Sequence, residues 1–123
     1  MDNNYKFSKN HIWVSDMGNS VFRLGISDYA KDSLGSVMFI KLPELNENLV
    51  LGEYFGDIES IKTVSDLISP VNGEVLLIND DVLDNPEKVN DDPLKYWLLE
   101  VKVNDEISDL MDEETYKSYI ETL

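Results

Sequence analysis

Short apolar runs separated by turn residues dominate the middle of this chain and favour a mostly-β fold. Each run has four to six residues and is rich in Val, Ile, Leu and Phe, which are common in strands. The runs are Val21–Ile26, Val37–Leu42, Gly56–Ile61, Val75–Ile78 and Leu98–Val103. In the last run Leu99, Val101 and Val103 alternate with Glu100 and Lys102, which indicates a strand with one buried face.

Two helices are predicted at the margins of this β pattern. Asp28 can cap a short helix that runs to Leu34 and ends at Gly35. Asp112 can cap a C-terminal helix whose apolar residues follow the i, i+3, i+4, i+7 spacing of one helix face. Those residues are Tyr116, Tyr119, Ile120 and Leu123. The segment 80–93 is rich in Asp, Asn and Pro, which predicts a solvated loop.

The chain is strongly acidic, with 25 Asp and Glu against 10 Lys and Arg and a formal net charge of −15. A charge of this sign is repelled by phosphate backbones and by anionic membrane surfaces, so we expect no nucleic-acid or membrane partner. Residues 74–123 hold 15 of the acids and four of the bases. The acidity serves either solubility or the recognition of a partner, and the composition leaves both interpretations open.

Residue counts exclude several kinds of site. The chain has no cysteine and one histidine, His11, which excludes disulfides, thiolate chemistry and a multi-histidine metal site. We find no Ser/His/Asp set, no carboxylate pair with cleft-like spacing and no phosphate-binding glycine motif, so no catalytic or metal-ligating residue is predicted. His11, Trp13 and Trp97 are interpreted as structural residues.

A length of 123 residues fits a single domain spanning residues 1–123. No apolar run approaches the ~20 residues of a membrane span, and the first residues lack the pattern of a signal peptide. We therefore expect a cytoplasmic protein, and we expect it to be a monomer.

Lys62 is isolated among acidic residues. It is the only base in the 46 residues between Lys41 and Lys88, which include 11 acids. Gly52 and Gly73 flank it almost symmetrically, and two strands that meet midway between them would form a hairpin with Lys62 at its tip. A Schiff-base lysine would need a desolvated pocket, which a hairpin tip does not offer. Lys62 is therefore either an ordinary exposed lysine or the attachment point of a long prosthetic arm.

The segment around Lys62 resembles the lipoyl-attachment segment of the glycine cleavage system H protein family. Glu59-Ser60-Ile61-Lys62 followed by Val64-Ser65-Asp66 is similar to the Glu-Ser-Val-Lys-Ala and Ser-Asp of that family. Further similar stretches follow in the family's order across residues 5–121. They are His11-Ile12-Trp13-Val14, Leu24 to Ala30, Leu34 to Glu44, Pro70 to Val75, Asn79 and Pro86 to Pro93.

The resemblance implies a lipoyl/biotinyl-type fold, a barrel-sandwich hybrid of two small antiparallel sheets with a short internal helix and a C-terminal helix. It implies a non-catalytic carrier with lipoate in amide linkage on Lys62. Such a carrier takes the aminomethyl group from a pyridoxal-phosphate glycine decarboxylase to an aminomethyltransferase, and a dihydrolipoamide dehydrogenase then reoxidises its dithiol. A lipoate ligase or a lipoyl/octanoyl transferase is the implied modifying enzyme.

Three departures from the family pattern bear on this interpretation. The loop 94–97 is one residue shorter and has no glycine, so any backbone that needed φ > 0 there is lost or remade. Thr63 replaces a small Ala after the lysine, close to where the arm would lie. Ile12 replaces a Glu, which we expect to affect acceptance by the modifying enzyme.

Two other identities are considered. A biotin or lipoyl domain of a dehydrogenase complex is disfavoured, because biotin usually lies in Met-Lys-Met and because extra elements precede Gly52 and follow Val103. A divergent H-like protein that stores or relays lipoate in another pathway stays open, since the altered loop 94–97 fits it.

Overall fold

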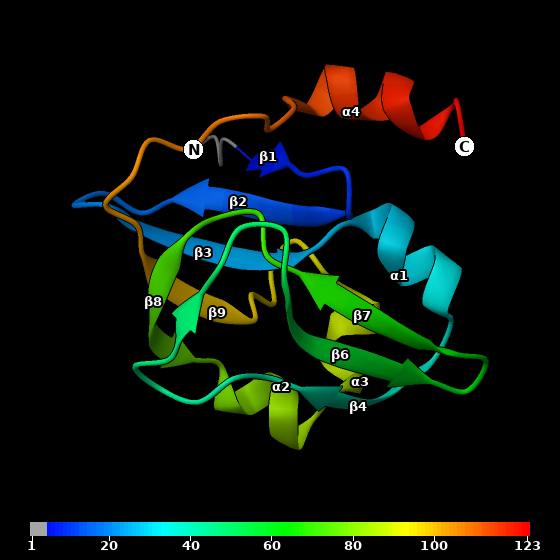
Figure 1. Cartoon of the computed structure of the whole chain (residues 1–123). Coiled ribbons are helices and arrows are strands. Elements are labelled where there is room, and N and C mark those ends of the chain that lie inside the picture. The colour runs from blue at the N-terminus through cyan, green and yellow to red at the C-terminus, as the bar shows by residue number, and fades with distance from the viewer. Residues whose placement is uncertain (1–4) are drawn as a thin grey trace.

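Two antiparallel sheets face each other across the interior of the computed structural model, which describes residues 5–123 (Figure 1). The six-stranded sheet has the order β1-β2-β3-β9-β8-β5, and the three-stranded sheet has the order β4-β6-β7. The strands of the larger sheet are β1 (Tyr5–Phe7), β2 (Ile12–Asp16), β3 (Val21–Ile26), β9 (Leu99–Lys102), β8 (Gly73–Ile78) and β5 (Asn48–Leu49). Those of the smaller sheet are β4 (Val37–Lys41), β6 (Tyr54–Ser60) and β7 (Val64–Ile68). The mostly-β prediction with two antiparallel sheets is confirmed.

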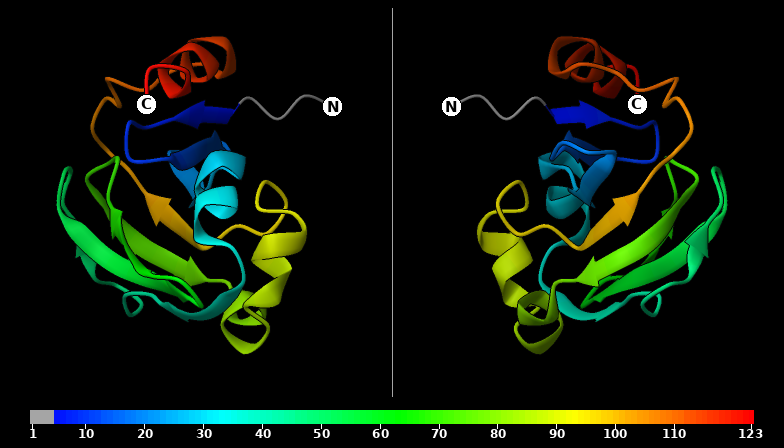
Figure 2. Two further views of the ribbon diagram at one scale, coloured as in Figure 1. Left: turned by 90° about the vertical axis from the view of Figure 1, so that its right-hand side faces the viewer. Right: turned by 90° about the vertical axis from the view of Figure 1, so that its left-hand side faces the viewer.

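Helices occupy the margins of the sheets (Figure 2). They are α1 (Asp28–Leu34), α2 (Asp80–Asp84), α3 (Glu87–Asp91) and α4 (Glu113–Ile120). The predicted bounds of α1 are confirmed, but its cap is wrong, because the Oγ of Ser27 accepts from the amide of Ala30 at 3.2 Å. Asp28 instead begins the first turn. Asp112 does cap α4, and Leu123 lies beyond the helix and is 61% exposed.

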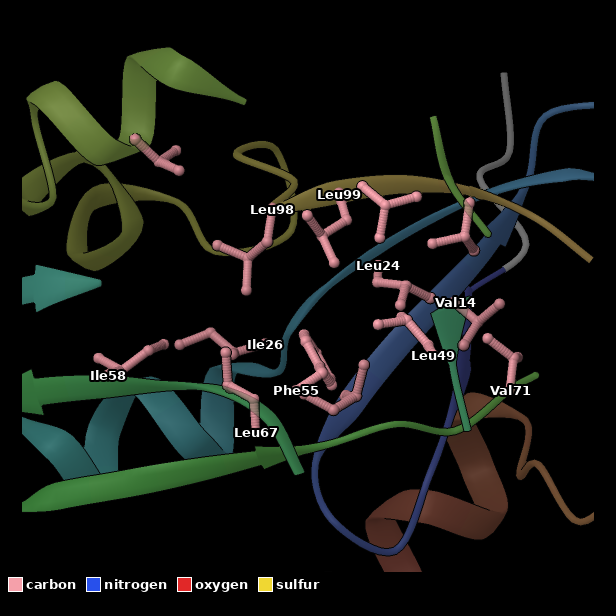
Figure 3. Packing of buried hydrophobic residues seen from close by; sticks show 14 of the residues in the cluster. Val14, Leu24, Ile26, Leu49, Phe55, Ile58, Leu67, Val71, Leu98 and Leu99 are labelled. Carbon is pink, nitrogen blue, oxygen red and sulfur yellow. The ribbon is translucent and has the colours of Figure 1, made fainter. Parts of the chain in front are cut away.

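A continuous apolar cluster fills the space between the sheets. Figure 3 shows Ile58 and Leu67 of the smaller sheet pointing into the same interior as Leu98 and Leu99 on the other side. Ile58, Leu98 and Leu99 are fully buried, and Leu67 is 3% exposed. The strands β6 and β7 therefore share one core with the six-stranded sheet, which fixes their position relative to the rest of the chain.

The prediction of a solvated loop over residues 80–93 is wrong, because this segment forms α2 and α3. Val82 and Val89 are fully buried in the core, and they anchor the two helices. The Asn79 side chain caps α2 by accepting from the amide of Asp81 at 3.2 Å. Asp and Asn favour helix caps as well as loops, and two well-spaced valines are too few for a periodic pattern.

The turn residues Val71-Asn72-Gly73 predict from the sequence that Gly73 lies in a turn and needs φ > 0, and that prediction is wrong. Gly73 is absent from the glycines with positive φ, which are Gly18, Gly35 and Gly52. A Cβ at Gly73 would instead lie 2.8 Å from the carbonyl oxygen of Lys102 and 3.1 Å from Val103 Cγ2. The glycine is needed because β8 and β9 approach closely at this point.

Within residues 5–123 no helix is long and apolar enough to cross a membrane. Residues 1–4, on which the expectation about a signal peptide partly depends, lie outside the described residues.

We predict that Gly73→Val destabilises the fold far more than Lys62→Ala. The added side chain meets backbone that cannot move without disrupting the β8–β9 pairing, and such overpacking costs about 1–3 kcal/mol. Lys62 is exposed, and exposed substitutions usually change the free energy of unfolding by about 0.5 kcal/mol or less. Urea unfolding of both variants measures the difference, and equal midpoints would contradict the close approach at Gly73.

Candidate functional site

The hairpin formed by β6 and β7 presents Lys62 at its tip, as the sequence predicted. The two strands pair from Tyr54 opposite Ile68 to Glu59 opposite Val64, and the turn between them projects beyond the sheet (Figure 1). The Ser60 amide donates to the Thr63 carbonyl at 2.8 Å and closes the turn. Lys62 lies in this turn and is exposed.

Ser60 holds the turn in shape without a glycine. Its hydroxyl oxygen accepts from the amides of Lys62 and Thr63, each at 3.2 Å, and donates to the Thr63 carbonyl at 3.1 Å. The side chain is buried, so these bonds are shielded from competing water. A serine two residues before the lysine was the local turn signal in the sequence, in place of Asn-Gly or Asp-Gly.

The end of α1 forms a platform beneath the tip. Ile61 donates its amide hydrogen to the carbonyl of Ser36 at 3.2 Å. Gly35 ends α1 with φ 75°, and the Lys62 side chain passes over it: a Cβ at Gly35 would lie 3.2 Å from Lys62 Cε and 3.5 Å from Nζ. Glycine at this position therefore both stops the helix and leaves room for the lysine.

Asn90 of α3 clamps this platform from below. Its Nδ2 donates to the Gly35 carbonyl at 2.6 Å, and its Oδ1 accepts from the Val37 amide at 2.8 Å. Both ends of one side-chain amide thus hold the backbone on which the tip rests. Sequence reasoning missed this residue, because it lies in the segment predicted as a loop. Its only signal was its place within the family-like run from Pro86 to Pro93.

The Lys62 ammonium group is available for reaction. Among residues 5–123 its Nζ makes no ion pair or hydrogen bond. Several other lysines are engaged, and the shortest contacts join Lys31 to Asp32 at 3.0 Å and Lys88 to Asp81 at 2.8 Å. The hydrogen bond to the acid raises the pKa of both Lys31 and Lys88. Lys41 lies at the end of β4 rather than in a turn.

The three departures from the family pattern lie in different environments. Ile12 is 1% exposed in the core, so any effect on acceptance by a modifying enzyme would act through packing and not through direct contact. Thr63 is exposed beside Lys62. The loop 94–97 has no residue with positive φ, and its Trp97 is half-buried with the Arg23 guanidinium 4.7 Å above the ring. The shorter loop is thus rebuilt without the backbone that a glycine would allow.

His11 and Trp13 are structural, as interpreted from the sequence. His11 Nδ1 lies 2.7 Å from the Tyr116 hydroxyl, which in turn lies 2.7 Å from the Ser27 hydroxyl. This network joins α4 to the residue that precedes β2 and to the cap of α1, and burial lowers the pKa of His11. Trp13 is buried and its Nε1 donates to the Pro93 carbonyl at 2.9 Å. In the described part of the chain no group of His, Asp and Glu is arranged to hold a metal ion.

Comparison with known proteins places this geometry in a family. The family model described as "Glycine cleavage H-protein" matches residues 5–123. The chain belongs to the glycine cleavage H-protein family. It is 44% identical over 118 residues to the glycine cleavage system H protein of Clostridioides difficile, with 94% of each chain covered. It is 43% identical over 124 residues to that of Vibrio parahaemolyticus, with 98% of each covered.

A solved H protein has the same architecture. The crystal structure of a glycine cleavage system H protein from Mycobacterium marinum superposes with a TM-score of 0.89. It is 29% identical in sequence, and the match covers 98% of this chain and 99% of that one. The fold expected from the resemblance is therefore the fold of the chain, and the H-protein match extends over both sheets and all four helices.

We predict that Asn90→Asp weakens the platform under the tip. The carboxylate keeps the acceptor for Val37 but places a second oxygen against the Gly35 carbonyl, and losing this partly buried bond costs on the order of 1 kcal/mol. Amide hydrogen exchange at Ile61 should accelerate along with the drop in unfolding free energy. Asn104→Asp, which adds the same charge at an exposed position, is the control and should leave both unchanged. Unaltered exchange at Ile61 in Asn90→Asp would contradict the clamp.

Proposed function

We propose that Lys62 carries lipoate in amide linkage and that the chain acts as the lipoyl-bearing carrier of the glycine cleavage system. The observation that carries this proposal is the exposed, unpaired lysine at the tip of a supported hairpin, in a chain that belongs to the H-protein family throughout residues 5–123. Membership of this family gives the chain a carrier's role alongside the other glycine cleavage enzymes.

The residues at the tip fit a long covalent arm. Lys62 supplies the amine, and the hydrogen bonds of Ser60 hold the backbone from which the arm would extend. When bound, the lipoyl group supplies disulfide and dithiol chemistry. The chain has no cysteine, so no thiol of its own can exchange with that disulfide.

The geometry of the tip supports a carrier rather than a catalyst. We propose that the lipoyl-bearing tip enters the active sites of a pyridoxal-phosphate glycine decarboxylase, an aminomethyltransferase and a dihydrolipoamide dehydrogenase. These encounters would take place in the cytoplasm. A tip that projects into solvent can enter each of three active sites in turn, and weak, transient contacts suit such a cycle. Neither the described residues nor the relatives favour the alternative of a lipoate relay in another pathway.

We predict that coexpression with a lipoate ligase and added lipoate attaches one lipoyl group per chain. Intact mass measures the number of groups, and peptide mapping places the group on Lys62. Lys62→Ala should abolish the modification while the protein stays folded, because the side chain is exposed. Lys41→Ala is the matched control and should be modified like the wild type. A label on Lys31 or Lys41 would show that the assignment of Lys62 is wrong.

Ionic strength should affect the carrier's encounters with its partners. A body of net charge −15 is steered toward basic surfaces, and salt screens this attraction over a Debye length of about 8 Å at physiological ionic strength. In the reconstituted system, glycine-dependent NADH formation should show an apparent KM for the lipoylated chain that rises from low to physiological salt. If the lipoylated chain supports no NADH formation at any salt concentration, the proposed carrier role is wrong.

A further inference from the structure

An apolar row lies on the outer face of the three-stranded sheet, close to Lys62. Phe39 of β4 and Val64 of β7 are both cross-strand partners of Glu59 on β6, so the three side chains share one face. Phe39 is 62% exposed and Val64 is 57% exposed. Ile61, next to the lysine in the turn, is 73% exposed. We call Phe39, Glu59, Ile61 and Val64 the tip face.

A charged row borders the tip face on the same side of the sheet. Lys41, Asp57 and Asp66 are cross-strand partners two residues further along their strands, which places them on the face that Phe39 and Val64 occupy. The Tyr54 hydroxyl donates to Asp57 at 2.7 Å. Lys41, Asp57 and Asp66 together carry a net negative charge along this border, and Glu59 adds a further carboxylate within the tip face itself.

Nothing in residues 5–123 covers this face. Both views of Figure 2 place the β4–β6–β7 sheet on the outside of the molecule, with no helix or strand over its outer surface. The core cluster and the six-stranded sheet lie on its inner side. Exposed aromatic and aliphatic side chains gathered beside a reactive group, with a polar rim, are typical of a protein-binding surface.

We propose that the tip face is the docking surface of the enzyme that acylates Lys62, and that this enzyme meets it with an apolar patch rimmed by Lys and Arg. The inference rests on the proposed function. An enzyme that forms a bond at Nζ must bring its active site within one lysine side chain of the hairpin, so it must cover the residues that flank the turn. A partner that acts on the far end of a long arm has no such requirement.

The acylation step itself sets this demand for close contact. The neutral Lys62 amine attacks the carbonyl carbon of an activated acyl donor, an acyl adenylate or acyl thioester. The N–C bond forms as the bond to the adenylate oxygen or to the thiol sulfur breaks, and the amine proton passes to a base. The leaving group departs as AMP or as the free thiol. The acceptor amine must be held still during this step, which contacts on both sides of the turn achieve.

The charge of the rim favours a basic partner. Glu59 lies between Phe39 and Val64, and Asp66 lies two residues beyond Val64 on β7. Both carboxylates are exposed, and pairing them with Lys or Arg gains attraction that an acidic or neutral partner would not offer. The rim thus selects among partners, while the apolar row supplies buried area.

The test uses the unmodified full chain with a purified lipoate ligase, lipoate and ATP. The double variant Phe39→Ser/Val64→Thr should raise the KM for the carrier by about tenfold or more, with kcat within about twofold, because docking contacts are lost while the amine is untouched. The matched control Leu77→Ser/Val50→Thr alters side chains that are 50% and 47% exposed and lie outside this sheet. It should keep the wild-type KM.

The outcomes separate this inference from the proposed function. A wild-type KM in Phe39→Ser/Val64→Thr, with Lys62 still acylated, overturns the docking surface and leaves the carrier role intact. A wild-type chain that is not acylated on Lys62 overturns both.

A footprint on the wild-type chain decides the question even if the double variant fails to fold. Adding the ligase without ATP to ¹⁵N-labelled protein should broaden the amide signals of Phe39, Glu59 and Val64. Broadening confined to the six-stranded sheet overturns the inference. Broadening of the tip face by an aminomethyltransferase, and none by the ligase, overturns it as well.

Discussion

The apolar layer between the two sheets is the constraint on which the site depends. A two-stranded hairpin is only marginally stable in water, so β6 and β7 need a base to hold their turn in one place. Ile58 and Leu67 supply it by entering the core shared with the larger sheet. Specific polar contacts then act at the far end, where Ser60 shapes the turn and Ser36 and Asn90 support it. The hydrophobic layer sets where the hairpin lies, and the hydrogen bonds set the shape of its tip.

Much of this arrangement could be predicted from local patterns. The strand Val21–Ile26 and the bounds of α1 have strong side-chain and turn signals, and the structure has both. The hairpin was predicted from Gly52 and Gly73, which flank Lys62 almost symmetrically and so indicate where two strands would meet. In each case, neighbours in the sequence determine the outcome.

Predictions failed where contacts distant in sequence decide the structure. α2 and α3 exist because Val82 and Val89 reach the core, and nothing within residues 80–93 signals that a core is near. Asn90 forms hydrogen bonds with Gly35 and Val37, which precede it in the sequence by 55 and 53 residues. The prediction that position 73 needs a glycine was right, but its reason, a positive φ, was wrong. The close approach of β9 that requires the glycine has no signal within residues 71–75.

The double role of Gly35 limits how this surface can change over evolutionary time. One demand comes from the backbone, which turns at φ 75° and ψ −143°, a region almost reserved for glycine. The other comes from Lys62, because a Cβ at position 35 would lie 3.2 Å from its Cε and the lysine would have to shift by a few tenths of an ångström. Any residue other than glycine at this position therefore meets a backbone penalty first and a small side-chain displacement second. The backbone is the firmer of the two constraints, so the site that supports the lysine keeps its glycine for as long as the helix ends there.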